Sequence, residues 1–350
     1  RAYDHIINFA PETKNYKDRA DPTSLINFVN NGGNILLAAT PGISETISNF
    51  AREFDIEFDE KETAVIDHFN YNISDEGKHT LLIAKGITKN PAILSKEVIE
   101  GPPVLFRGIG HKVGTVPLLT RILWASNTSY SYETKDDSVD QEPFIVGNEI
   151  GLISALQARN NARVTFVGSL DLFSDSFFDY SIQNPVSSEK FSKSGNKDFA
   201  RDLVKWTFQE KGVLRVTSRR HHKEGEVNLF LLACSLSKTY TIEISEYDND
   251  HWKAFNGTDV QFEAIMLDPY IRKNLTPLPT SPEHHARKFK AHIQLPDVYG
   301  VFTFKVNYKR PGYTYIVDTS VVAIRPFRHN EYPRFISAAY PYYTSAASMI

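Results

Sequence analysis

The feature that most constrains the fold is an alternation of short apolar runs with amphipathic segments across residues 1–213. Asp21-Pro22 predicts a helix start, because Asp is a favoured N-cap and Pro is favoured at the first helical position. Gly32-Gly33 ends that helix, and the apolar run 35–39 is typical of a buried parallel strand. The alternation therefore predicts an α/β layer with a mostly parallel sheet.

Two further amphipathic segments fit the same architecture. Apolar residues at spacings of three and four, which form one face of an α-helix, occur in segment 43–54. Segment 196–211 repeats this pattern and closes the α/β region, and Gly212 is its predicted C-cap.

The pattern changes to a period of two in the second part of the chain. In segment 302–308 apolar and polar residues alternate, so one face of this strand is apolar and the other is solvated. Several runs of similar length, separated by Gly, Pro, Asp and Asn, predict an antiparallel β-sandwich over residues 214–330. Segment 276–285 contains three prolines and is predicted to be a solvent-exposed loop.

Composition excludes several classes of protein. The 39 Lys and Arg residues against 42 Asp and Glu give a formal net charge of −3, which argues against nucleic-acid binding, because that function needs a basic face. The single Cys234 excludes an intrachain disulfide and a cysteine-ligated zinc or cluster site. Nothing near Cys234 would stabilise a thiolate, so we expect it to be a buried structural residue. The sequence contains no run of about 18 apolar residues, so it predicts no bilayer-spanning segment.

The patterns at the two ends of the chain lead us to expect that the natural protein is longer. Residues 3–9, close behind Arg1, already have the pattern of a strand, so we expect further residues upstream, with a secretory signal as one candidate. In segment 338–350 tyrosines are followed by small and apolar residues, as in the interfacial belt before a membrane helix. A frayed tail of a soluble domain is the alternative.

The stretch most like a catalytic site follows the predicted strand 164–167. Ser169 would be a nucleophile, Asp171 an orienting acid and His68 the base. However, the turn that exposes such a serine usually reads G-x-S-x-G, and Gly168 adjoins Ser169 directly. The structural alternative is that Ser169 and Asp171 bind backbone N–H groups of a turn and a helix start.

Other candidate binding residues have equally plain structural interpretations. Arg159 and Arg163 bracket the turn Asn160-Asn161 and are suited either to holding an anion or to a hairpin ion pair. The pairs His221-His222 and His284-His285 lack a further ligand at helical spacing, so surface loops explain them better than a metal site does. Neither G-x-G-x-x-G nor a P-loop occurs, and the sequence predicts no cofactor.

Four N-x-[ST] sequons make Asn72, Asn127, Asn256 and Asn274 candidate glycosylation sites. About this number is expected by chance from the frequency of Asn, Ser and Thr in the chain. The sequons alone therefore scarcely favour a secreted location.

Several long strings resemble one family in order and almost from end to end. They are DEKETAVIDHFNY at 59–71, LFRG at 105–108, LQARNNARV at 156–164, GSLDLFSDSFF at 168–178, GVLRV at 212–216, LPDVYGVF at 295–302 and AYPYY at 339–343. Together they resemble the non-catalytic 48 kDa-type subunit of oligosaccharyltransferase.

The resemblance implies a type I protein of the endoplasmic reticulum, mostly lumenal, with one C-terminal membrane helix. It implies a complex that transfers a glycan from dolichyl diphosphate to Asn of N-x-[ST] segments, with the chemistry performed by a different, multi-spanning subunit. The family contributes assembly and stability, and whether it also handles the lipid-linked donor or the acceptor is open. No catalytic residue is carried over. The implied fold is a flavodoxin/amidotransferase-like domain over 1–213, the β-sandwich, and a juxtamembrane segment at 331–350.

Three hypotheses follow for the function. The first is an accessory subunit of oligosaccharyltransferase, with sister subunits as partners. The second is a free-standing serine hydrolase that uses Ser169, Asp171 and His68. The third is a carbohydrate-binding module with Arg159 and Arg163 near its ligand.

Overall fold

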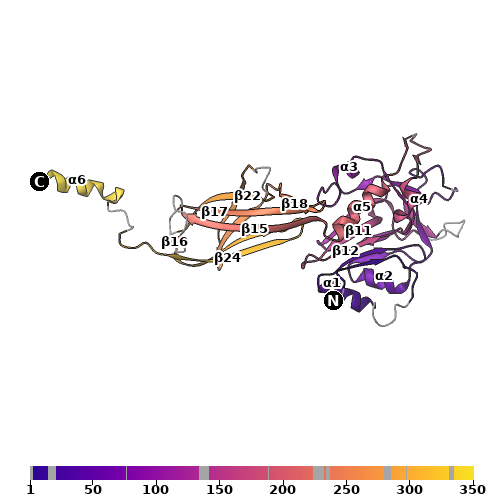
Figure 1. Ribbon diagram of the computed structural model, residues 1–350, viewed down its shortest axis with the longest axis horizontal. Helices are drawn as coiled ribbons and strands as arrows, with labels where there is room; N and C mark the ends of the chain where they lie inside the picture. The colour runs from indigo at the N-terminus through magenta and orange to yellow at the C-terminus, as the bar shows by residue number, and fades with distance from the viewer. Residues whose placement is uncertain are drawn as a thin grey trace. The chain divides into compact units, whose positions relative to one another are not determined.

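The computed structural model describes residues 3–14, 21–75, 77–133, 142–187, 189–223, 232–233, 237–279, 285–296, 298–330 and 335–350. The chain forms two compact units (Figure 1). Unit 1 comprises Arg1–Val213, Tyr247–His251 and Lys309–Tyr315, and unit 2 comprises Leu214–Glu246, Trp252–Tyr308 and Ile316–Ile350. Cys234 and His284 lie outside the described residues.

Unit 1 is built around an eight-stranded sheet with the order β1-β2-β12-β11-β8-β3, in which β9 pairs with β11 and β6 pairs with β9. Its strands are β1 His5–Asn8, β2 Asn34–Ala38, β3 Ile56–Phe58, β6 Gly86–Ile87, β8 His111–Val113, β9 Leu119–Trp124, β11 Gly151–Gln157 and β12 Arg163–Val167. Three two-stranded sheets accompany it: β4 Thr63–Ile66 with β10 Tyr130–Glu133, β5 Leu82–Ala84 with β7 Val104–Phe106, and β13 Ile182–Gln183 with β14 Lys190–Phe191.

The large sheet is mixed, whereas the sequence predicts a mostly parallel one. Strands β1, β2 and β12 are parallel neighbours, but β11 pairs antiparallel with β12, β8 and β9. The reason lies in the connection between β11 and β12. A short turn around Asn160-Asn161, with Asn161 at φ 67°, can only return the chain antiparallel, because a parallel pair needs a long crossover.

Helices cover both faces of this sheet (Figure 1). In β2, whose residues are all buried, Ile35 and Leu37 pack in one apolar cluster with helices α1 and α2, and Leu36 and Ala38 pack in another with helix α5. Because successive side chains of a strand point to opposite faces, a strand buried on both faces must be continuously apolar. The helices of unit 1 are α1 Pro22–Asn30, α2 Glu45–Arg52, α3 Lys96–Ile99, α4 Asp175–Phe178 and α5 Asn196–Thr207, with 3₁₀ turns η1 Gly147–Glu149 and η2 Asp171–Phe173.

The predicted starts of α1 and α5 are confirmed, but the predicted end of α5 is wrong. The helix ends at Thr207, and Gln209 takes the left-handed conformation (φ 62°) that follows its C-cap Phe208. Gly212, the predicted C-cap, lies in strand β15 with φ 68°. A Cβ there would lie 2.6 Å from the carbonyl oxygen of Gly312, so close backbone packing requires this glycine.

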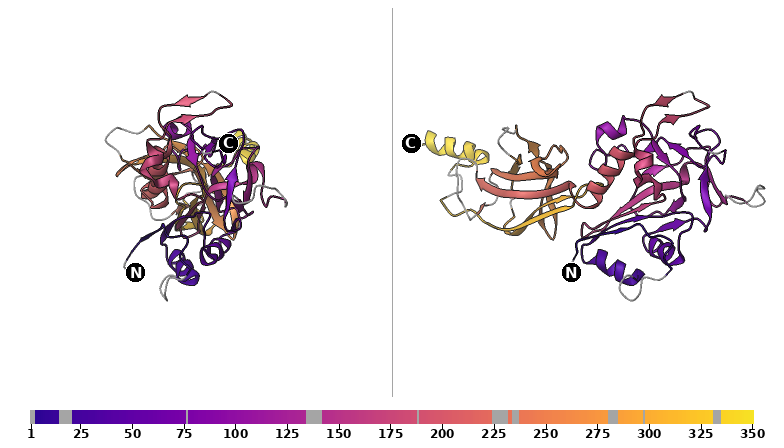
Figure 2. Two further views of the ribbon diagram at one scale, coloured as in Figure 1. Left: turned by 90° about the vertical axis from the view of Figure 1, so that its right-hand side faces the viewer. Right: turned by 45° about the vertical axis from the view of Figure 1, so that its right-hand side comes forward.

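Unit 2 contains two five-stranded sheets, visible as two layers in Figure 2. One has the order β15-β17-β22-β21 with β18 beside β17, and the other has the order β16-β24-β23-β19-β20. The strands are β15 Lys211–Lys223, β16 Leu232–Ala233, β17 Ser237–Asp248, β18 His251–Ala254, β19 Gln261–Met266, β20 Asp268–Asn274, β21 Thr276–Pro277, β22 Arg287–Gln294, β23 Gly300–Tyr308 and β24 Ile316–Arg325.

Aromatic side chains from both sheets form the core of unit 2. Tyr240 of β17 lies 4.5 Å from Phe262 of β19, measured between ring centroids, and Phe262 lies 5.2 Å from Phe304 of β23. The predicted alternation in segment 302–308 is confirmed, because Phe302, Phe304, Val306 and Tyr308 are buried. The predicted loop 276–285 begins instead with a strand, since Thr276 and Pro277 pair with Lys290 and Phe289.

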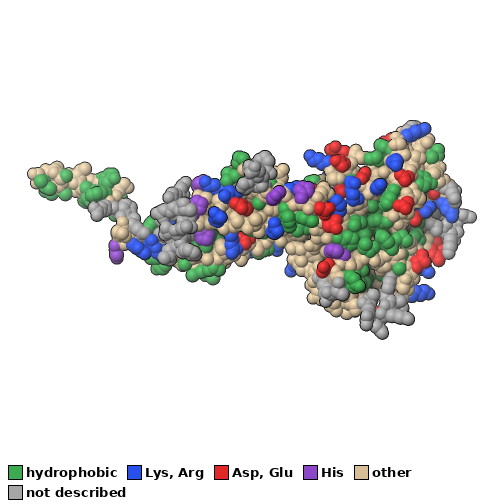
Figure 3. All heavy atoms as spheres, viewed as in Figure 1, with side chains coloured by type: hydrophobic (Ala, Val, Ile, Leu, Met, Phe, Trp, Pro, Cys, Tyr) green, Lys and Arg blue, Asp and Glu red, His purple; other side chains and the backbone are tan. Residues whose placement is uncertain are grey.

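The chain ends in a 3₁₀ turn, η3 Ser337–Ala339, and a helix, α6 Tyr340–Ser348. Tyr342 of this helix is 75% exposed, and apolar side chains are visible along it in Figure 3. Across the described segments, no helix combines the length and apolar character that a membrane crossing requires.

Candidate functional site

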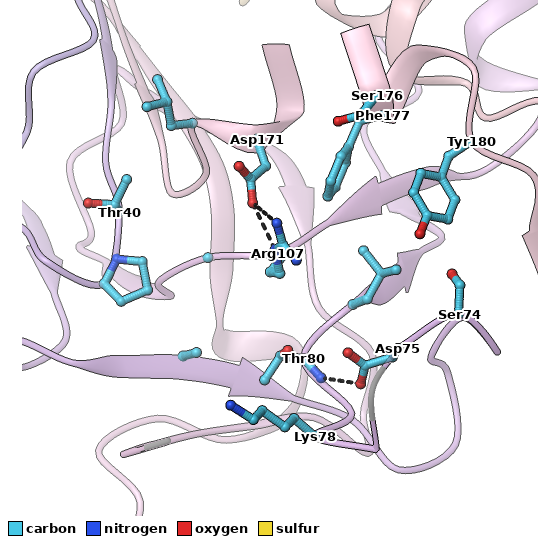
Figure 4. Close-up of a pocket in the computed structure, with 15 residues that line it drawn as sticks. Thr40, Ser74, Asp75, Lys78, Thr80, Arg107, Asp171, Ser176, Phe177 and Tyr180 are labelled. Atoms are coloured by element: carbon cyan, nitrogen blue, oxygen red, sulfur yellow. Dashed lines mark hydrogen bonds and ion pairs between the residues drawn. The ribbon is translucent and has the colours of Figure 1, made fainter. Parts of the chain in front are cut away.

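A large cavity of unit 1 lies where strands β2 and β12 end. It has a volume of about 600 Å³. Thr40 and Pro41 follow β2, Leu170 and Asp171 follow β12, and Arg107 follows β7. Ligands of α/β sheets bind outside the carboxyl ends of the strands, so this cavity is the candidate site of unit 1 (Figure 4).

An ion pair occupies the centre of the cavity wall. Arg107 donates from Nε to Asp171 Oδ2 at 2.8 Å, and its Nη2 lies 2.7 Å from the same oxygen. The Arg107 guanidinium also lies 5.6 Å from the centroid of the Phe177 ring. Both charged side chains are about half exposed, so they remain available to hydrogen-bond a ligand.

The opposite wall carries further polar groups (Figure 4). The backbone N–H of Thr80 donates to Asp75 Oδ2 at 3.0 Å, which leaves the other carboxylate oxygen of Asp75 as an acceptor. The exposed Lys78 belongs to this wall, and the hydroxyl of Ser176 and the ring of Tyr180 line the cavity elsewhere. Balanced charges and hydroxyls beside aromatic rings suit a polar, hydroxyl-bearing ligand better than an apolar one.

Close backbone contacts shape the floor of the cavity. Gly108 lines it, and a Cβ at Gly108 would lie 2.0 Å from the carbonyl oxygen of Gly168. The N–H of Ile109 donates a hydrogen bond to the same carbonyl oxygen, Gly168 O, at 2.8 Å. These two glycines therefore allow the ends of β7 and β12 to meet.

The structure does not assemble the predicted triad. Ser169 is buried, and its hydroxyl donates to the carbonyl oxygen of Arg107 at 2.6 Å. His68 Nε2 lies 2.9 Å from the hydroxyl of Tyr130, and Asp171 pairs with Arg107. Each candidate group is engaged with another partner, so the catalytic interpretation is not supported. The structural alternative, in which Ser169 and Asp171 bind backbone N–H groups, also differs from the contacts observed. Ser169 donates to a carbonyl group, and Asp171 accepts from the side chain of Arg107.

The structure places the two arginines that were predicted to bind an anion in different environments. Arg159 is exposed and lines a smaller cleft. Arg163 is fully buried, and its guanidinium donates to four carbonyl groups, those of Trp206, Lys211, Gly212 and Gly312. The predicted hairpin ion pair is thus absent at Arg163, whose described acceptors are all backbone oxygens.

Sequence reasoning missed the role of Asp67. Its carboxylate accepts hydrogen bonds from the backbone of Phe69 at 2.8 Å and Asn70 at 3.0 Å, and from the hydroxyls of Ser126, Thr128 and Ser129. Burial raises the pKa of Asp67, but these hydrogen bonds, led by that of Ser126, outweigh burial and hold the pKa below its ordinary value. The hydroxyl residues at 126–129 could have indicated hydrogen-bond donors for a carboxylate. Because they are about 60 residues from Asp67 in the sequence, no local pattern connects them with it.

The four sequon asparagines differ in exposure. Asn127, Asn256 and Asn274 are exposed. Asn72 is fully buried: its amide donates to Ser74 Oγ at 3.0 Å and to the carbonyl oxygen of Ser181 at 3.1 Å, and its Oδ1 accepts from the backbone of Gln183 at 2.8 Å. A glycan on this amide nitrogen could not be accommodated in the fold.

We therefore expect Asn72 to be unmodified in the folded protein, and any glycan to be on the exposed sequons. Peptide mapping after enzymatic deglycosylation in ¹⁸O water would mark each former glycan position by a mass shift. The peptide that contains Asn72 is expected to show no shift. A fully labelled Asn72 in folded protein would contradict this assignment.

Metal chemistry finds no support in the described residues, among which no group of three His, Cys, Asp or Glu side chains could hold an ion. The hydroxyl of Ser169 is bound to Arg107 O and Asp171 is paired with Arg107, so the cavity presents charged and polar groups that can bind a ligand.

Comparison with known proteins gives the family. A family model described as the OST48 N-terminal domain matches residues 1–210, and one described as the OST48 middle domain matches residues 222–350. Relatives from Danio rerio, Drosophila melanogaster and Caenorhabditis elegans are 42%, 40% and 39% identical over 99% of this chain and 78% of their own lengths. Each is named the 48 kDa subunit of dolichyl-diphosphooligosaccharide–protein glycosyltransferase. The chain therefore belongs to the OST48 family, which confirms the resemblance seen in its sequence.

Proposed function

We propose that this chain is a non-catalytic subunit of the oligosaccharyltransferase complex, acting in protein N-glycosylation at the membrane of the endoplasmic reticulum. The names of the relatives support the complex and the process. The observation that supports a non-catalytic role is the buried Ser169, whose hydroxyl is bound to Arg107 O. A serine nucleophile must reach both a base and a substrate.

The finer parts of this proposal come from the family resemblance. The partners are the other subunits, including the multi-spanning catalytic one, and the chain faces the lumen and is held by a single membrane helix. Unit 1 is proposed to be a flavodoxin/amidotransferase-like domain over residues 1–213, unit 2 a β-sandwich over residues 214–330, and residues 331–350 a juxtamembrane segment.

A replacement experiment tests the non-catalytic role. Cells depleted of this subunit are supplied with the wild-type chain or with Ser169→Ala, each within the full-length protein, and glycan transfer to a sequon peptide is measured on the purified complex. We expect depletion to reduce transfer and to disrupt the complex, and Ser169→Ala to restore both. Intact transfer and an intact complex after depletion would refute the proposal. Failure of a stably folded Ser169→Ala chain to support transfer would contradict the non-catalytic role of Ser169.

Within this role, the large cavity of unit 1 is the proposed contact with the glycan of the lipid-linked donor, because hydroxyls and paired charges lie beside the rings of Phe177 and Tyr180. In the purified complex, Tyr180→Ala is expected to raise the KM for the donor and to leave the KM for the acceptor peptide unchanged. Equal changes in both values, or none in either, would contradict this contact.

A further inference from the structure

A second cleft of unit 1, separate from the cavity near Arg107, is lined by cationic side chains. It has a volume of about 230 Å³ and lies between the start of β9, the end of β11 and segment Lys309–Tyr315. This volume is below the range of about 300–1,000 Å³ that is typical of drug-sized ligands. The cleft therefore suits a small ligand.

The charge of the cleft has one sign. Arg159, Lys309 and Arg310 line it, and no Asp or Glu is among the described residues of its lining. Arg159 and Lys309 are exposed, and the Lys309 ammonium lies 6.0 Å from the centroid of the Tyr315 ring. Three cations from two segments of the chain attract a compact anion.

A fourth positive charge lies directly behind the wall of the cleft. Arg163 is buried, and two of its partners also line the cleft: it donates to the carbonyl oxygen of Gly312 at 3.2 Å, and its guanidinium lies 4.6 Å from the Trp206 ring. The carbonyl groups accept hydrogen bonds from Nη1 and Nη2 of Arg163 but carry no net charge, and its buried Nε has no hydrogen-bond partner among the residues that the structure describes. A buried charge without a counter-charge is unfavourable, and an anion in the cleft would supply one.

The cleft also contains an unsatisfied acceptor. Gln157 is 4% exposed and lines the cleft. Its Nε2 donates to the carbonyl oxygen of Tyr313 at 2.6 Å, whereas its Oε1 is buried and has no hydrogen-bond donor. A buried acceptor without a donor is rare in native proteins. A hydroxyl group on the bound anion would satisfy it.

We propose that this cleft binds a phosphate ester of a small hydroxyl-bearing compound, such as a sugar phosphate. Arg159, Lys309 and Arg310 hold the phosphate, Gln157 Oε1 accepts a hydrogen bond from a hydroxyl of the ligand, and the ring of Tyr315 contacts its carbon skeleton. Phosphate is favoured over a single carboxylate because a dianion can engage several cations at once.

The test is calorimetric titration of the 350-residue chain with glucose 6-phosphate, inorganic phosphate and glucose, with sodium chloride at matched ionic strength. Glucose 6-phosphate is expected to bind about tenfold more tightly than phosphate, which is the size of effect that one hydrogen bond to a buried acceptor gives. Glucose alone is expected not to bind measurably.

Variants separate the two parts of the site. The double variant Arg159→Gln with Lys309→Gln is expected to weaken the binding of glucose 6-phosphate and of inorganic phosphate at least about tenfold. The control Lys96→Gln, at an exposed position on α3, is expected to change neither affinity. Gln157→Leu is expected to remove only the preference for glucose 6-phosphate over phosphate. Because Arg159 and Lys309 are exposed, their replacement keeps the test valid even if Gln157→Leu fails to fold.

Three results would overturn the proposal. One is a response to glucose 6-phosphate no larger than the response to sodium chloride. The second is unchanged binding in the double variant. The third is tighter binding of hexaglutamate than of either phosphate, which would assign the cleft to an acidic peptide.

Discussion

Replacing Arg163 by Ala is expected to lower the free energy of unfolding of unit 1 by about 4 kcal/mol. Hydrogen bonds that involve a charged group contribute about 1.5–3 kcal/mol each, and removing a large buried side chain adds a cavity. These contributions are not additive, and losses above about 4 kcal/mol are exceptional. The expected loss is still the largest that we predict for a single side chain of this molecule.

The reason is the number of segments that Arg163 joins. From strand β12 its guanidinium reaches the end of α5 at Trp206, the start of β15 at Lys211 and Gly212, and segment Lys309–Tyr315 at Gly312. Burial lowers the pKa of Arg163 to about 9, although the electrostatic interaction with Tyr315 acts to raise it. The group remains charged at neutral pH, so all its hydrogen bonds are charge-assisted.

Arg159 provides the matched control, because it flanks the same turn but is exposed. Urea unfolding followed by tryptophan fluorescence would compare Arg163→Ala, Arg163→Lys and Arg159→Ala. Arg159→Ala is expected to change stability by less than about 0.5 kcal/mol. Arg163→Lys keeps the charge but loses the planar fork, so an intermediate loss is expected. Equal effects at positions 159 and 163 would show that the buried hydrogen bonds do not contribute as described.

The second large effect concerns pH and His111. This residue of β8 is completely buried, with Nε2 2.7 Å from Ser154 Oγ and Nδ1 without a hydrogen-bond partner. Burial lowers the pKa of His111 from 6.5 to about 3. The imidazole is therefore neutral in the folded protein, where it packs against the ring of Phe58.

The direction of the pH effect follows from proton binding. Below pH 6.5 the unfolded chain protonates His111 while the folded chain does not, so acid favours unfolding. Each pH unit below 6.5 removes about 1.4 kcal/mol, down to about pH 3. From pH 6.5 to pH 4.5 we expect His111 to reduce the free energy of unfolding by about 2–3 kcal/mol.

The measurement is urea unfolding at pH 7.5, 6.5, 5.5 and 4.5, for the wild type and for His111→Gln. Glutamine stays neutral over this range. The free energy of unfolding of His111→Gln is therefore expected to fall less steeply with decreasing pH, by the amount assigned to His111. The pKa of His221 is also lowered, chiefly by burial, but His221 is present in both proteins and its contribution cancels. Parallel curves for the two proteins would mean that His111 is protonated within the fold.

Local sequence patterns were sufficient for helices α1 and α2, for the start of α5 and for the strands buried on two faces. Segment 43–54 shows its apolar face through spacing alone, and residues 35–39 show burial through a continuous apolar run. Strand pairing is not contained in such patterns. The sequence signals of β11 and β12 are similar to that of β2, and only the short turn between β11 and β12 indicates that these two strands are antiparallel.

The candidate site was predictable in place but not in chemistry. The end of β12 does form a wall of the cavity near Arg107, and Asp171 does line it. Its partner Arg107, however, is 64 residues away, and the buried contacts of Ser169 come from the same distant loop. Whether a serine is a nucleophile or a structural hydrogen-bond donor depends on such contacts, which no local motif specifies.

The way in which unit 1 is assembled from the chain has a consequence for biosynthesis. Segment Lys309–Tyr315 belongs to unit 1, although it follows most of unit 2 in the sequence. A ribosome that has made only residues 1–213 has not yet supplied the carbonyl group of Gly312 to Trp206 Nε1 and Arg163. Unit 1 cannot complete its core during translation until about a hundred further residues have emerged. Its nascent form must therefore stay soluble while incompletely folded.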